Sequence, residues 1–171
     1  MEQVSFYSKD IIKTSKKDDW ETPQALFDKL NNIYKFTLDP CATHENAKCK
    51  KYYTKEDNGL SKDWGGEIVF MNPPYGRDIK IWVRKAYQES LNGATVVCLI
   101  PARTDTSYWH DYIFPNAKNI EFLRGRLKFE VNGAAKDPAP FPSAIIIFGD
   151  SCETCHNKVY KVCNCKPVVN K

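Results

Sequence analysis

The sequence predicts an α/β domain built on a sheet that carries helices on both faces. Residues 68–71, 95–100 and 144–148 are short and almost wholly apolar, which is typical of buried strands. Segments with apolar residues at helical spacing alternate with these strands. The 171 residues suffice for one ordinary domain, and a composition of 42% hydrophobic residues excludes disordered and low-complexity classes.

The first predicted helix begins at Thr22-Pro23, with Thr22 as the N-cap and Pro23 at the first helical position. Its apolar face is formed by residues at helical spacing: Leu26, Phe27, Leu30 and Ile33. A short strand at 36–38 follows and ends at Asp39-Pro40. After a loop or short helix at 41–50, residues 51–54 are expected to form a second strand.

The strand at 68–71 ends at a pair of prolines, which cannot continue a central ladder. An amphipathic helix is expected at 79–91, and Asn92-Gly93 ends it. The strand at 95–100 ends at Pro101. The remaining predicted elements are a short helix at 107–114 and strands at 120–123, 127–131 and 144–148.

Three of the predicted strands end in turns that carry functional side chains. These turns are Asp39-Pro40-Cys41-Ala42, Asn72-Pro73-Pro74-Tyr75 and Pro101-Ala102-Arg103. Ligands of α/β sheets bind beyond the carboxyl ends of the strands. We therefore expect the three turns to converge on one edge of the sheet.

The turn Asn72-Pro73-Pro74-Tyr75 has a specific chemical use. The exocyclic amine of adenine is a poor nucleophile, because its lone pair is delocalised into the ring. The side-chain oxygen of Asn72 and the carbonyl of Pro73 can accept its two N–H bonds, and rigid prolines fix both acceptors before reaction. Tyr75 offers a face on which a flipped base can stack.

A series of motifs runs in order across residues 18–148. The motifs are Trp20-Glu21-Thr22-Pro23, Leu38-Asp39-Pro40-Cys41-Ala42, Tyr52-Tyr53-Thr54-Lys55-Glu56-Asp57-Asn58-Gly59-Leu60, Asp63-Trp64, Asn72-Pro73-Pro74-Tyr75, Pro101-Ala102-Arg103-Thr104-Asp105-Thr106 and Gly125-Arg126-Leu127-Lys128-Phe129. With this ordered set the chain resembles the phage-type, Dam-like DNA N6-adenine methyltransferases. The resemblance implies a Rossmann-like methyltransferase sheet with an antiparallel last strand, S-adenosylmethionine as cofactor and adenine N6 in DNA as target.

The resemblance also implies roles for individual residues. The catalytic residues are Asn72, Pro73, Pro74 and Tyr75. The residues expected at the cofactor are Trp20, Thr22, Pro23, Asp39, Pro40, Cys41 and Ala42, with Asp57 and Asp63 as alternatives for its ribose and adenine. The turn at 39–42 departs from methyltransferases in general because it lacks glycine.

DNA contacts are expected from Arg103, which follows a strand end, and from Arg126, which lies in a family motif. Little of the chain remains for a separate target-recognition domain. A short recognition sequence, read by loops within 102–142, is therefore expected. The biological role we expect is protection of phage DNA against host restriction.

The two ends of the chain differ from the methyltransferase domain at 18–150. Residues 1–17 form a lysine-rich arm, and residues 151–171 hold four cysteines. Cys152, Cys155, Cys163 and Cys165 are spaced for a structural zinc knuckle, with His156 as an alternative fourth ligand and a tail of reduced cysteines as the other interpretation. No run of about 18 apolar residues and no signal peptide is present, so we expect a cytoplasmic protein without a membrane span or an evident protein partner.

Other functions stay open at this point. The same tetrapeptide occurs in enzymes that methylate RNA adenines or protein glutamine amides, because the amine or amide chemistry is shared. The chain lacks the additional helical domain and glycine-rich first loop of the glutamine-methylating class. A third alternative is a non-catalytic DNA-binding module with a degenerate core, which the intact Asn72-Pro73-Pro74-Tyr75 motif disfavours.

Overall fold

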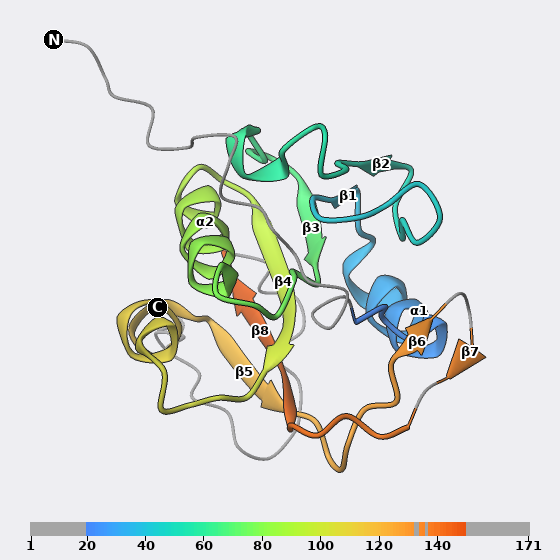
Figure 1. Ribbon diagram of the computed structural model, residues 1–171. Helices are drawn as coiled ribbons and strands as arrows, with labels where there is room; N and C mark the ends of the chain where they lie inside the picture. The colour runs from blue at the N-terminus through green and yellow to red at the C-terminus, as the bar shows by residue number, and fades with distance from the viewer. Residues whose placement is uncertain (1–19, 132–133, 136, 150–171) are drawn as a thin grey trace, which may run out of the picture.

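The computed structural model describes residues 20–131, 134–135 and 137–149. This part of the chain contains a central sheet and helices, which confirms the predicted α/β class (Figure 1). The predicted arm at 1–17 and the cysteine-rich tail at 151–171 lie outside the described residues.

The central sheet has six strands in the order β2-β1-β3-β4-β8-β5. They are β1 (Leu38–Asp39), β2 (Lys51–Tyr52), β3 (Ile68–Met71), β4 (Thr95–Pro101), β5 (Asn119–Phe122) and β8 (Ser143–Phe148). The first four run parallel to one another. The last strand in the sequence, β8, inserts between β4 and β5 and is antiparallel to both.

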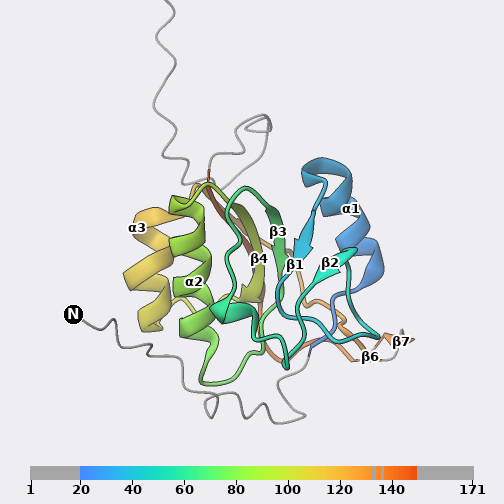
Figure 2. The ribbon, with the colours of Figure 1, turned by 90° about the horizontal axis from the view of Figure 1, so that it is seen from above.

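Helices lie on both sides of this sheet (Figure 2). Helix α1 (Gln24–Tyr34) covers one face, and α2 (Ile79–Leu91) and α3 (Phe114–Asn116) cover the other. A π-helical turn, η2 (Trp109–Ile113), replaces most of the helix predicted at 107–114. A 3₁₀ turn, η1 (Gly59–Ser61), precedes β3. No helix of the described chain is long and apolar enough to span a lipid bilayer.

The first helix corrects two sequence predictions. It begins at Gln24, so Pro23 occupies the N-cap position and Thr22 does not cap the helix. The acceptor for the Gln24 N–H is instead the carboxylate of Glu130, at 3.2 Å. Ile33 is 48% exposed, so the buried stripe of α1 is narrower than its apolar spacing suggests.

Glu130 belongs to a small hairpin outside the main sheet. Its strands are β6 (Glu130–Val131) and β7 (Ala134–Ala135), which pair antiparallel. The predicted strand at 127–131 is therefore reduced to its last two residues. An antiparallel bridge between Glu130 and Glu21 ties this hairpin to the segment that leads into α1.

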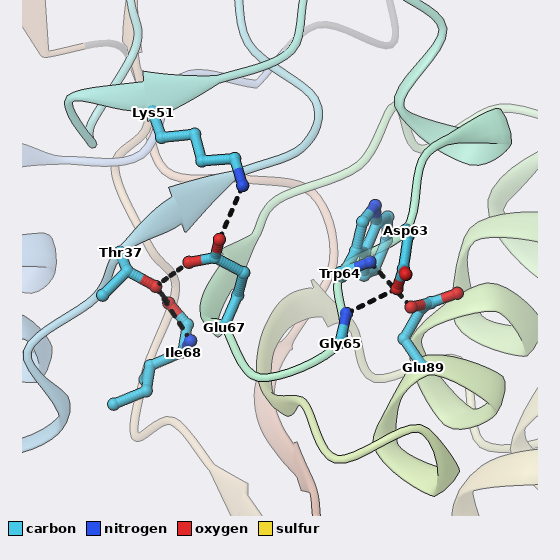
Figure 3. Close-up of polar contacts among 8 residues, drawn as sticks. All are labelled: Thr37, Lys51, Asp63, Trp64, Gly65, Glu67, Ile68 and Glu89. Carbon is cyan, nitrogen blue, oxygen red and sulfur yellow. Dashed lines mark hydrogen bonds and ion pairs between the residues drawn. The ribbon is translucent and has the colours of Figure 1, made fainter.

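Polar side chains connect the strands at the amino edge of the sheet (Figure 3). Glu67, just before β3, accepts hydrogen bonds from Thr37 at 2.5 Å and from Lys51 at 2.6 Å. Asp63 lies at this same edge, where its carboxylate accepts the Gly65 N–H at 2.7 Å. The three turns identified from the sequence follow the carboxyl ends of β1, β3 and β4, at the opposite edge of the sheet.

Candidate functional site

The carboxyl edge of the sheet opens into a cavity of about 630 Å³. The turns after β1 and β3 meet there, as the sequence predicts, because the two strands are parallel neighbours. The residues that line the cavity are Trp20, Glu21, Thr22, Asp39, Pro40, Cys41, Ala42, Thr43, His44, Glu45, Asn46, Lys48, Thr54, Lys55, Glu56, Asn58, Gly59, Phe70, Asn72, Pro73, Pro74 and Trp82. The turn after β4 is not part of this wall.

Asn72 occupies the wall of the cavity directly after β3. Its Nδ2 donates to the main-chain carbonyl of Trp20 at 2.5 Å and to Oγ1 of Thr22 at 2.9 Å. Its Oδ1 is buried and has no hydrogen-bond partner among the described residues. An unpaired buried acceptor is costly and calls for an explanation, and an N–H donor of a bound molecule would satisfy it.

The other residues of the turn divide between the cavity and the core. Pro73 and Pro74 line the cavity, whereas Tyr75 does not. The Tyr75 side chain is only 3% exposed, and its ring contacts Phe129 and Phe141 edge-on. In this structure the ring therefore offers no open face to a base. The sequence does not show this burial, because it depends on aromatic residues more than 50 positions away.

The Asp39 carboxylate organises the loop that follows β1. Oδ1 accepts the Cys41 N–H at 3.4 Å and Oδ2 accepts the Lys48 N–H at 3.1 Å. Burial raises the pKa of Asp39 to about 6, against the lowering effect of these two hydrogen bonds. Burial likewise raises the pKa of the Cys41 thiol well above its usual value, so this cysteine is a neutral wall residue.

The glycine missing from the 39–42 turn is supplied by another segment. A Cβ on Gly59 would lie 2.0 Å from the Pro40 carbonyl oxygen, so only glycine permits this approach. Both residues line the cavity. The indole N–H of Trp64 also donates to the Gly59 carbonyl, at 3.0 Å. Sequence reasoning missed Gly59 as a site residue, because nothing in the local sequence indicates that it packs against Pro40.

The two acids proposed for the cofactor ribose and adenine lie elsewhere. Asp57 accepts hydrogen bonds from the main chain and hydroxyl of Thr54, both at 2.9 Å, and is not a cavity residue. Asp63 lies at the amino edge of the sheet, away from the cavity (Figure 3). The neighbouring acid Glu56 does line the cavity, and the motif alone could not distinguish Glu56 from Asp57 in this respect.

An aromatic cluster closes one side of the site. Trp20 packs against Phe129 and Phe141 with ring centroids 5.3 and 5.2 Å apart. The guanidinium of Arg103 lies 5.6 Å from the centre of the Phe141 ring, which places the turn after β4 beside this cluster. Arg126 is exposed, and no cavity contact is found for it.

A metal site is not found in the part of the chain that the structure describes: no group of three or more suitable side chains occurs there. The zinc ligands predicted from spacing, Cys152, Cys155, Cys163 and Cys165, lie outside that part. Cys98 is buried in β4, as expected for a core residue.

Comparisons with known proteins agree with the family resemblance of the sequence. The family model for DNA N-6-adenine-methyltransferase (Dam) matches residues 9–159. A protein of Haemophilus phage HP1 (strain HP1c1), named DNA N-6-adenine-methyltransferase, is 35% identical over 146 residues, which cover 82% of this chain and 84% of the relative. A protein of Escherichia phage T1 with the same name is 34% identical over 119 residues, which cover 68% of this chain and 49% of that relative.

Proposed function

The chain belongs to the DNA N-6-adenine-methyltransferase (Dam) family, and we propose that the cavity between β1 and β3 is its methyl-transfer site. The protein is an adenine-specific DNA methyltransferase. This membership favours DNA over RNA or protein amides, the alternatives that the tetrapeptide left open. The proposal rests on Asn72, which lines the cavity and whose Oδ1 is buried without a hydrogen-bond partner among the described residues.

In the proposed reaction Asn72 and Pro73 act together on the target amine. The Asn72 Oδ1 and the Pro73 carbonyl accept the two N–H bonds of adenine N6. This geometry draws the nitrogen lone pair out of conjugation with the ring, so the nitrogen can attack. Both acceptors are in place before the substrate arrives, since the prolines and the Asn72 contacts hold them, which is electrostatic preorganisation.

The family implies S-adenosylmethionine as the methyl donor, and the cavity fits this group. A volume of about 630 Å³ is in the range of small-molecule sites. When bound, S-adenosylmethionine supplies a sulfonium methyl group. Asp39 and the following turn residues, Pro40, Cys41 and Ala42, would hold its methionine part. Glu56, rather than Asp57 or Asp63, would bind its ribose hydroxyls, because only Glu56 of these three lines the cavity.

DNA contacts are proposed for two arginines. Arg103 lies beside the aromatic cluster at the site, where it can reach a phosphate near the target base. Arg126 is exposed in the loop between β5 and β6. The zinc role of the four tail cysteines remains a prediction from spacing, and metal analysis of the purified protein tests it.

A methyl-transfer assay tests the site. Purified protein is mixed with unmethylated DNA and labelled S-adenosylmethionine, and the DNA is digested to nucleosides for mass analysis. We expect N6-methyladenine with the wild-type protein and with Asn32→Ala, an exposed asparagine of α1 that serves as the matched control. Asn72→Ala should bind the cofactor and form no product. Undiminished methylation by Asn72→Ala would exclude the proposed site.

A further inference from the structure

The side-chain amide of Asn72 is held in one orientation by a segment 50 residues away in the sequence. Its Nδ2 donates to the Trp20 carbonyl and to the Thr22 hydroxyl. The Trp20 carbonyl can only accept, so it can face only the NH₂ end of the amide. A flip of the amide would place two acceptors against each other. The Trp20 and Thr22 contacts together hold the amide so that Oδ1 is the end left for the substrate.

The segment that holds Asn72 is itself fixed by the β6 strand. The Glu130 N–H donates to the Glu21 carbonyl at 2.9 Å, in the residue between Trp20 and Thr22. The Glu130 carboxylate accepts the Gln24 N–H just beyond them. Anchors thus lie on both sides of Thr22, so its hydroxyl meets Asn72 from a constrained backbone.

The buried Thr22 hydroxyl forms a hydrogen bond with Asn72 and does not cap helix α1. Thr22 is 3% exposed, and burying a hydroxyl is unfavourable unless it forms a hydrogen bond. Helix α1 begins at Gln24 and uses no side-chain cap from its N-cap residue. The Thr22 hydroxyl instead accepts a hydrogen bond from Nδ2 of Asn72. Its buried position therefore serves the orientation of the amide.

We propose that Thr22 is a positioning residue for methyl transfer, whose hydroxyl holds the Asn72 amide with Oδ1 toward the target amine. The proposal rests on the proposed function of Asn72. Without the hydroxyl, one N–H of Nδ2 keeps the Trp20 carbonyl and the other loses its acceptor. The amide then samples other rotations, and the rate of transfer falls while cofactor binding is unaffected. This differs from the cofactor contact that family resemblance implies for Thr22.

The test compares Thr22→Val, which keeps the shape and lacks the hydroxyl, with Thr22→Ser, which keeps the hydroxyl. For each full-length protein, kcat is measured with saturating DNA and S-adenosylmethionine, and the cofactor Kd is measured by calorimetry. We expect Thr22→Val to lower kcat about tenfold or more, the effect of one hydrogen bond, with an unchanged cofactor Kd. Thr22→Ser should restore kcat to nearly the wild-type value.

Three results would overturn the proposal. An unchanged kcat in Thr22→Val would show that the hydroxyl does not matter. A weaker cofactor Kd at constant kcat would assign Thr22 to the cofactor. Equal losses in the Val and Ser variants would indicate packing alone. Failure of the proposed function is recognised separately, because Asn72→Ala would then retain activity whatever Thr22 does.

A spectroscopic measurement covers the case in which Thr22→Val does not fold. In ¹⁵N-labelled wild-type protein, the Asn72 side-chain NH₂ signals are identified by their absence in Asn72→Ala. The structure predicts slowed solvent exchange for both protons, since both have acceptors. In Thr22→Ser this protection should persist. Rapid exchange of both protons in the wild-type protein would contradict the arrangement.

Discussion

The hydroxyl of Tyr75 donates a hydrogen bond to the main-chain carbonyl of Leu99 at 3.1 Å, inside the protein. Leu99 belongs to β4, so the last residue of the Asn72–Tyr75 turn is attached to the neighbouring strand. Burial raises the pKa of Tyr75 well above its usual value, which keeps the hydroxyl a donor. Tyr75 thus anchors the turn that presents Asn72.

Variants of Tyr75 distinguish a structural role of its side chain from a direct role in methyl transfer. Tyr75→Phe should lower the free energy of unfolding by about 1 kcal/mol, the contribution of one hydrogen bond, and keep kcat close to wild type. Tyr75→Ala should cost about 3–5 kcal/mol, because it leaves a cavity in the core. Denaturant unfolding and the methyl-transfer assay provide the two readouts. Loss of activity in Tyr75→Phe at near-wild-type stability would show instead that the hydroxyl acts on the substrate.

Gly59→Ala should distort the cofactor side of the cavity. The new methyl group would overlap the Pro40 carbonyl, so the 39–42 turn must move. We expect a loss of about 1–3 kcal/mol of stability and weaker binding of S-adenosylmethionine. The matched control is Ser61→Ala, an exposed residue of the same η1 turn, which should bind the cofactor normally. Equal cofactor affinity in both variants would mean that the turn adapts without cost.

Asp39 should make stability depend on pH. Its pKa is about 6 in the folded protein, above its ordinary value of 3.8, so the folded state holds the proton more tightly. Stability from this group is present below about pH 4 and is lost as pH rises through about 6, by about 3 kcal/mol in total. Asp39→Asn should lack this decrease. Unfolding curves of the two proteins at pH 4 to 7 test this, and parallel pH profiles would contradict it.

Two lysines of α2 should differ in their effect on stability. Lys85 lies 2.5 Å from Glu89, with side-chain exposures of 12% and 5%. The Glu89 carboxylate also accepts the Trp64 main-chain N–H at 2.8 Å. Lys85→Met leaves a buried carboxylate without its cation and should cost about 3 kcal/mol.

Lys80→Met is the matched control for Lys85→Met. Its ion pair with Asp111 is exposed at 44% and 49%, so screening by solvent makes its loss much less damaging. Denaturant unfolding of the two variants should therefore rank Lys85→Met clearly below Lys80→Met. Equal losses would indicate that burial of the Glu89 pair is energetically unimportant.

Much of the fold could be predicted from local patterns. The strands at 68–71 and 95–100 and the helix at 79–91 are long or apolar enough for their periodicity to decide their type. Short elements were less predictable: the segment at 107–114 contains a π-helical turn, and β2 keeps only two residues of the expected four. In such elements tertiary contacts outweigh intrinsic preference.

The candidate site was predictable where its functional residues are adjacent in one turn. The Asn72–Tyr75 motif and the 39–42 turn lie at the same cavity because parallel neighbouring strands end at one edge. Which acidic residue lines the cavity was not predictable in this way. Asp57 and Asp63 stand in family motifs, yet the positions of their turns exclude both from the cavity wall, and Glu56 lines it.

The sequence by itself determined the reaction class, the α/β architecture and the turn that presents the two acceptors. Each of these depends on residue types at neighbouring positions. Only the tertiary structure decided how Asn72 is oriented, that Gly59 admits the Pro40 carbonyl, and that Glu130 caps α1. These are contacts between distant segments, and their geometry arises from packing, which no local pattern of residues encodes.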